Sequence, residues 1–204
     1  MRTMAENSTI NNEQYFVSSG AVNTSGLVEQ RYGRWEARVK LPMVGESPGY
    51  TLHSSIWLFS DHKNPQRSGC PQEIDVVEQY TGSHTAVSDA VANIHPFNGS
   101  RATKTQCTKV PYKRGPSTTA RGDWSTDWTV FTVDWSEDWI VMRVNGSPYA
   151  VFAPPGVEAR AVAAFTDPLF LALTACVMDR VPPTEADVFP LEYLVDWVRV
   201  YEWA

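Results

Sequence analysis

Apolar and polar residues alternate with a period of two along much of this 204-residue chain. The clearest stretch lies within Tyr32 to Leu41, where charged residues stand between Trp35, Ala37, Val39 and Leu41. Such alternation is typical of a β-strand with one buried face and one polar face. Alternation, or short runs of β-branched and aromatic residues, predicts further strands over residues 52–59, 73–80, 89–95, 129–135, 139–144, 149–152, 169–177 and 194–203.

Turn signals separate these predicted strands, and helical periodicity is rare. Asn145-Gly146 is a strong tight-turn signal, and residues 157–164 are predicted to form one short helix. Many short strands with frequent turns indicate an antiparallel all-β sandwich. We expect a single domain over residues 21–204. Residues 1–20 are polar and contain few large apolar side chains, so we expect little order there.

Composition and charge narrow the class of protein. The net charge of -6 gives no support for nucleic-acid binding. The longest apolar run, Leu169 to Met178, is too short to span a bilayer, so we expect no membrane contact. The N-terminus lacks the apolar core of a signal peptide. Four asparagines nevertheless lie in glycosylation sequons, which favours an extracellular protein; they are Asn7, Asn23, Asn98 and Asn145.

The sequence around the three cysteines predicts different environments for them. Cys176 lies in the apolar run and is expected to be a small core residue. Cys70 and Cys107 lie in polar loops, where a disulfide and two free thiols are equally compatible with the sequence. The cysteines and histidines do not have the spacing of a zinc site, and we expect no bound metal.

Residues 73–80 are the main candidate for a catalytic segment, because they carry three carboxylates separated mainly by β-branched residues. On a regular strand Glu73 and Asp75 share one face, while Glu78 points to the other. A β-bulge at Val76-Val77 would return Glu78 to the first face. The three acids would then form one row.

The spacing of this row indicates a reaction. The backbones of Glu73 and Glu78 would lie roughly 13 Å apart at ~3.3 Å per step. If the side chains lean inward, their carboxyl groups can approach the separation of about 5–5.5 Å found in retaining glycosidases. Asp75, between them, would help to keep one glutamate ionised and the other protonated. A solvated strand edge or a calcium site would also explain three clustered acids.

The hexapeptide from Glu73 to Glu78 resembles the bulged active-site signature of glycoside hydrolase family 16. Tyr32 to Pro42, Ser55 to Leu58 and Val195 to Tyr201 resemble other strands of that family, and the likeness covers roughly residues 22 to 203. It implies a concanavalin A-like jelly roll whose concave face forms a sugar-binding cleft, with no cofactor. Since family members usually have more strands before Thr24, we expect this chain to lack the first strands.

The resemblance also implies roles for individual residues. Glu73 would be the nucleophile, Asp75 the assisting carboxylate and Glu78 the acid/base. Trp57 would lie beneath the cleaved sugar. His95, with Asn93 beside it on the same strand face, would lie near the leaving group.

Two further substrate-binding residues are predicted from the local pattern. Trp124 lies in a polar loop and is a candidate for stacking on a sugar ring. Arg34 points outward from its predicted strand and is a candidate for hydrogen bonds to sugar hydroxyls. Each candidate has a structural alternative, because a strand tryptophan is often a core residue and an outward charge is often solvated.

We therefore expect a monomeric, retaining endo-β-glycoside hydrolase that cleaves a polysaccharide. Ser54-Ser55 before Trp57, and Pro183 to Asp187, resemble the agar- and porphyran-cleaving members of the family. The expected substrate is therefore a red-algal galactan, or otherwise a β-1,3-glucan. The alternatives are a non-catalytic carbohydrate-binding module and an inactive fragment of such an enzyme.

Overall fold

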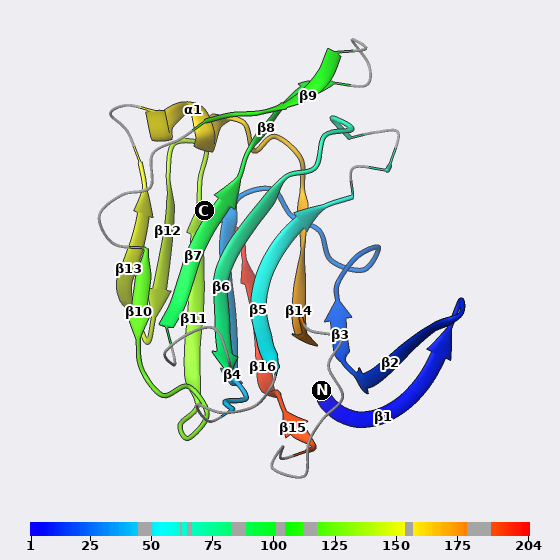
Figure 1. The fold of residues 1–204 in the computed structure, drawn as a ribbon. Helices are drawn as coiled ribbons and strands as arrows, with labels where there is room; N and C mark the ends of the chain where they lie inside the picture. Colours follow the sequence, from blue (N-terminus) through cyan, green and yellow to red (C-terminus); the bar gives the residue numbers. More distant parts are fainter. Residues whose placement is uncertain are drawn as a thin grey trace.

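The computed structural model describes residues 1–44, 50–61, 63–64, 67–82, 89–100, 105–111, 118–153, 157–178 and 189–204. The two largest sheets are antiparallel and lie one in front of the other (Figure 1). The six-stranded sheet has the order β10 (Thr119–Arg121), β7 (Asp89–His95), β6 (Glu73–Gly82), β5 (Thr51–Ser60), β14 (Leu169–Val177) and β3 (Gly20–Asn23). The five-stranded sheet has the order β13 (Ser147–Phe152), β12 (Ile140–Val144), β11 (Thr129–Trp135), β4 (Gly33–Lys40) and β16 (Leu194–Tyr201).

The two sheets pack face to face and bury one large apolar core. Strand β4 alternates between buried and half-buried residues along its whole length, as its period-two pattern predicts. Its buried Trp35 belongs to the same core cluster as Phe131 of β11 and Ile56 and Ile74 of the opposite sheet. The prediction of an antiparallel all-β sandwich is confirmed.

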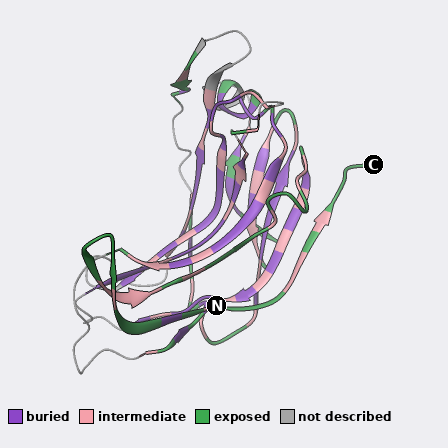
Figure 2. Ribbon diagram, turned by 90° about the vertical axis from the view of Figure 1, so that its right-hand side faces the viewer, coloured by how far each residue is buried: buried purple, intermediate pink, exposed green. Residues whose placement is uncertain are grey.

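The sandwich is curved, and the curvature gives the two outer faces different shapes. Figure 2 shows that the long strands bend along their length, so that the exposed face of the six-stranded sheet is concave. The five-stranded sheet lies behind it, on the convex side. Side chains that project from the front of β5, β6 and β14 therefore face a shared hollow.

The smaller elements lie at the ends of the sandwich. They are β1 (Arg2–Ile10), β2 (Glu13–Ser18), β8 (Phe97–Ser100), β9 (Thr105–Lys109), β15 (Leu191–Glu192) and the short helix α1 (Val157–Ala163). The predicted helix and the tight turn at Asn145-Gly146 are both present, and both turn residues have positive φ. No helix in the described part of the chain is long and apolar enough to cross a membrane.

The expectation of little order in residues 1–20 is wrong. Strand β1 pairs with β2 and with β15, and the chain reverses at Asn11 and Asn12, whose φ angles are 51° and 65°. The N-terminal amine also donates a hydrogen bond of 2.7 Å to the carbonyl of Tyr193. Backbone pairing around an asparagine turn orders this segment, and a search for large apolar side chains overlooks that signal.

A disulfide joins Cys70 and Cys107, so these two cysteines are not free thiols. Cys70 is fully buried and lies three residues before β6, whereas Cys107 lies in β9. The bond therefore ties the segment that enters β6 to the β8–β9 hairpin.

Candidate active site

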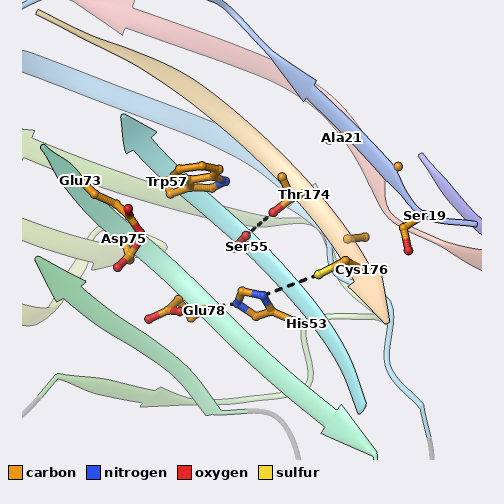
Figure 3. Close-up of a pocket in the computed structure, with 12 residues that line it drawn as sticks. Ser19, Ala21, His53, Ser55, Trp57, Glu73, Asp75, Glu78, Thr174 and Cys176 are labelled. Atoms are coloured by element: carbon orange, nitrogen blue, oxygen red, sulfur yellow. Dashed lines mark hydrogen bonds and ion pairs between the residues drawn. The ribbon is translucent and has the colours of Figure 1, made fainter. Parts of the chain in front are cut away.

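A bulge in β6 determines where the three acids point. Asp75 is paired with Trp57 of β5, but the next pair is Val77 with Ile56, which leaves Val76 as an extra residue. The register with β7 shifts over the same part of the strand, between Asp75 and Glu78. As the strand pattern predicted, Glu73, Asp75 and Glu78 therefore line one pocket of about 360 Å³ (Figure 3).

The apolar residues of the same segment hold the bulge in place. Ile74, Val76 and Val77 are each at most 2% exposed and belong to the core between the sheets. The hydroxyl of Tyr149, on β13, donates a hydrogen bond to the carbonyl of Val76. This contact satisfies a backbone group that the irregular ladder leaves available.

A histidine from the neighbouring strand contacts the central carboxylate. Nε2 of His95 lies 3.1 Å from Oδ2 of Asp75, and the side-chain nitrogen of Asn93 lies 3.0 Å from the same ring nitrogen. The interaction of its protonated ring with the Asp75 carboxylate raises the pKa of His95. Burial raises the pKa of Asp75 in spite of this contact. Burial, followed by the charge of Asp75, raises the pKa of Glu73 to about 7.

Glu78 has a different environment from Glu73. Burial alone would raise its pKa, but contacts to His53 and Tyr80 outweigh burial and bring the pKa below its usual value. The Tyr80 hydroxyl donates a 2.9 Å hydrogen bond to Oε1 of Glu78, and Nε2 of His53 lies 3.6 Å from the same oxygen. The environments of the two glutamates thus push their pKa values apart, with the higher pKa at Glu73.

Several pocket residues were missed in the sequence. His53 and Ser55 precede Trp57 on the same face of β5, and their cross-strand partners on β14 are Cys176 and Thr174. The hydroxyls of Ser55 and Thr174 are hydrogen-bonded to each other. The period of two that marks Trp57 also marks His53 and Ser55, so part of this set was visible in the sequence.

The remaining wall of the pocket comes from the residue between β2 and β3 and from the start of β3. Ser19, Gly20 and Ala21 line it (Figure 3), so the segment expected to have little order borders the site. Cys176 also lines the pocket and is half-buried, so the prediction that it belongs to the core is wrong.

Three predicted substrate-binding residues lie at the site. Trp57 lines the pocket, while His95 and Asn93 lie beside Asp75 on β7. Asn93 and His95 are the register partners of Asp75 and Glu73 on this sheet. The sequence thus identified the strand that flanks the acids.

The predictions for Trp124 and Arg34 are wrong. Trp124 is only 7% exposed and packs edge-to-face on Phe131 at 5.5 Å, in the core between the sheets. Arg34 lies on β4 in the five-stranded sheet and forms an ion pair of 2.6 Å with Asp134. Polar neighbours in sequence made Trp124 look exposed, and strand alternation alone did not reveal which sheet carries Arg34.

The row of acids also has the composition of a cation site. Donor atoms of Glu73, Asp75 and His95 lie within 4.8 Å of one another. The contact between Asp75 and His95 already occupies one donor atom of each residue.

One of the sequence features that predicted a galactan substrate, Pro183 to Asp187, lies outside the described residues.

A curved β-sandwich with paired glutamates on its concave sheet has the fold and site of a glycoside hydrolase. The family model for glycosyl hydrolases family 16 matches residues 2–198. The chain therefore belongs to this family and is an enzyme that acts on glycosidic bonds. No curated protein sequence shows a significant match to the chain.

Solved structures show the same fold. The laminarinase catalytic domain of Thermotoga maritima has a TM-score of 0.70 and 24% identity, and the match covers 100% of this chain and 76% of the other. The endo-β-1,3-glucanase of Pyrococcus furiosus has a TM-score of 0.68 and 24% identity, with coverages of 100% and 74%. A structure from work on endo-acting mucin O-glycanases of the human gut microbiota has a TM-score of 0.70 and 20% identity, with coverages of 98% and 72%.

Proposed function

We propose that the chain is a retaining endo-β-glycanase that cleaves a polysaccharide by double displacement. Glu73 attacks the anomeric carbon while Glu78 protonates the departing oxygen, and this step forms a glycosyl-enzyme. Glu78 then removes a proton from the water that releases the sugar and restores Glu73. The observation that carries the proposal is the bulge that brings Glu73, Asp75 and Glu78 into one pocket.

This mechanism requires a proton to move from Glu73 to Glu78 before the glycosidic bond is cleaved. The raised pKa of Glu73 and the lowered pKa of Glu78 favour a proton on Glu73, whereas bond cleavage needs it on Glu78. Asp75 lies between the two glutamates and is hydrogen-bonded to Glu73. We infer that binding of the sugar moves the proton along this row, since positive charge developing at the anomeric carbon favours ionised Glu73.

The substrate belongs to one of two classes. The solved relatives include laminarinases, which favours a β-1,3-glucan. The run Ser54-Ser55 before Trp57 instead favours a red-algal galactan of the agar or porphyran type. In either case, the face of Trp57 stacks on the apolar face of a sugar ring. We propose that the protein acts as an extracellular monomer with one catalytic domain.

Sugar release tests the proposal. Laminarin, lichenan, agar, porphyran and carrageenan are each incubated with the protein, and new reducing ends are measured. One substrate should be cleaved, and NMR should show the β-anomer as the first product. A protein that binds one of these polymers without releasing sugar would be a carbohydrate-binding module, not an enzyme.

A substitution of the nucleophile tests the assignment of the acids. Glu73→Gln should lower kcat by about three or more orders of magnitude, while calorimetry shows that oligosaccharide binding persists. Glu36→Gln is the matched control, because Glu36 lies on β4 of the opposite sheet and contacts Thr132. Turnover close to wild type in Glu73→Gln would contradict the role of Glu73.

A further inference from the structure

His53 lies in the middle of a row of side chains that crosses three strands of the concave sheet. It is on β5, with Tyr80 of β6 as its register partner on one side and Cys176 of β14 on the other. Glu78 stands two residues before Tyr80, so it projects on the same face. Figure 3 shows the imidazole between Glu78 and Cys176, with a contact to each.

The position of the imidazole is fixed by stacking. The rings of His53 and Tyr80 are stacked, with centroids 4.3 Å apart and planes at 12°. The His53 side chain is only 17% exposed, so it has little room to turn away. Tyr80 thus acts twice, since its ring orients His53 and its hydroxyl donates to Glu78.

The two ring nitrogens have different neighbours. Nδ1 of His53 lies 3.9 Å from Sγ of Cys176, and Nε2 lies 3.6 Å from Oε1 of Glu78. Burial lowers the pKa of His53, but its contacts with Cys176 and Glu78 raise the pKa to about 9. Both ring nitrogens therefore carry protons at neutral pH, and Nε2 presents one of them to Glu78. Nδ1 donates to Sγ of Cys176, whose own proton is directed to Sδ of Met178.

Both contacts to Glu78 involve the same oxygen. The Tyr80 hydroxyl and Nε2 of His53 approach Oε1, so we assign proton transfer with the substrate to Oε2. A carboxylate that accepts a hydrogen bond from Tyr80 and meets the cationic ring of His53 at the same oxygen has a restricted plane and direction. Efficient general acid/base catalysis depends on that direction.

We propose that His53 is a positioning residue for Glu78, and that Cys176 holds Nδ1 of His53 so that Nε2 faces the carboxylate. This inference rests on the proposed role of Glu78 as acid/base. The other titratable groups around the pocket are Glu73 and Asp75 on β6 and His95 on β7. Those groups act mainly at the Glu73 end of the row, whereas His53 and Tyr80 contact Glu78 directly.

His53→Phe is the sharpest test, because phenylalanine keeps the ring stacking on Tyr80 and removes both nitrogens. On the plateau of the pH profile, kcat/KM for the polysaccharide should fall about 10-fold or more. The same constant for a 2,4-dinitrophenyl glycoside of the same sugar should change less than about threefold, because that leaving group needs little protonation. The acid limb for the polysaccharide should move to higher pH, because Glu78 has the lower pKa of the two glutamates in the free site and its ionised form loses a favourable contact.

Three further variants test the contacts around His53. Tyr80→Phe should behave like His53→Phe, while Tyr15→Phe on β2 removes a hydroxyl that contacts Glu13 and serves as its matched control. Cys176→Ala should also move the acid limb upward, and Cys176→Ser should hold it in place because the serine hydroxyl oxygen still accepts a hydrogen bond from Nδ1.

The outcomes separate this inference from the proposed function. Equal losses on both substrates, or an unmoved acid limb in His53→Phe, would overturn the positioning role while leaving the glycanase intact. A wild-type protein that cleaves no polysaccharide, or a fully active Glu78→Gln variant, would overturn both. Near-UV circular dichroism and the melting temperature of each variant establish that the fold is preserved.

Discussion

Nε2 of His95 lies 3.1 Å from Oδ2 of Asp75, across the pair of strands β6 and β7. The contact places a basic group next to a carboxyl that is only 3% exposed. His95 also lowers the pKa of Glu73 through its charge, against the larger effects of burial and of Asp75. His95 therefore favours the ionised form of Glu73, the residue that we propose as the nucleophile.

Removal of His95 should make the enzyme need a higher pH. In His95→Ala, Glu73 loses a nearby positive charge, so its pKa should rise further above about 7. The alkaline limb of kcat/KM should move upward, because Glu73 has the higher pKa of the two glutamates, with a larger loss of activity at pH 6 than at pH 8. Arg121→Ala is the control, because Arg121 on β10 is an 87% exposed cation paired with Asp89. An unchanged alkaline limb in His95→Ala would exclude this electrostatic role.

Ionisation of Glu73 should lower the free energy of unfolding as the pH rises. Its folded pKa of about 7 lies above the usual value, so between about pH 4.5 and 7 the folded state binds more protons than the unfolded state. Stability therefore falls as the pH rises through this window. Glu73→Gln should melt at a higher temperature than wild type at pH 8, and the difference should shrink at pH 4.5. Calorimetry at both pH values decides, and a variant that is less stable at both would contradict the argument.

The sequence was sufficient to predict the strand that carries the acids. A period of two, interrupted by one extra apolar residue, predicts the bulge at Val76, because Glu73 and Glu78 cannot otherwise share a face. The same pattern predicted β4, β5, β7, β11 and β14 closely, since each buries one or both faces. Local periodicity therefore accounts for most of the fold and for the catalytic row.

The sequence did not show which distant residues meet on the concave sheet. His53 and Cys176 are 123 positions apart, and only the register of β5 with β14 brings them together. The prediction that Trp124 binds the sugar failed for a related reason. Its sequence neighbours are polar because they lie in a loop, whereas its ring is buried in the core. Contacts of this kind depend on strand order and register, and periodicity within one strand contains no information about either.

Arg34 should affect stability and not substrate binding. It makes two hydrogen bonds to Asp134, of 2.6 and 3.0 Å, and Arg143 adds a third of 2.9 Å. Burial would raise the pKa of Asp134, but the two arginines lower it below its usual value. Stability from this cluster is therefore present above the unfolded pKa of about 3.9 and is lost as the pH falls through the folded pKa.

Arg34→Ala should lower the free energy of unfolding by about 1–2 kcal/mol at pH 7, because Arg143 remains with the buried Asp134. KM should stay at the wild-type value, since Arg34 lies on the sheet opposite the pocket. Arg2→Ala is the control, as its pair with Glu192 is exposed on both sides and should contribute less than about 0.5 kcal/mol. A raised KM in Arg34→Ala would restore the sugar-binding role.

Trp57 should act mainly through binding. Its ring lines the pocket beside the acids and packs against Phe59 at a centroid distance of 5.3 Å. Stacking of such a ring on a sugar contributes roughly 1–2 kcal/mol, so Trp57→Ala should raise KM by about 5- to 30-fold. Trp57→Phe should recover part of this loss because it keeps an aromatic face. Trp128→Phe is the matched control, since Trp128 packs under Arg38 and Lys40 of β4. If Trp57→Ala changed kcat alone, the ring would be positioning the acids rather than holding the sugar.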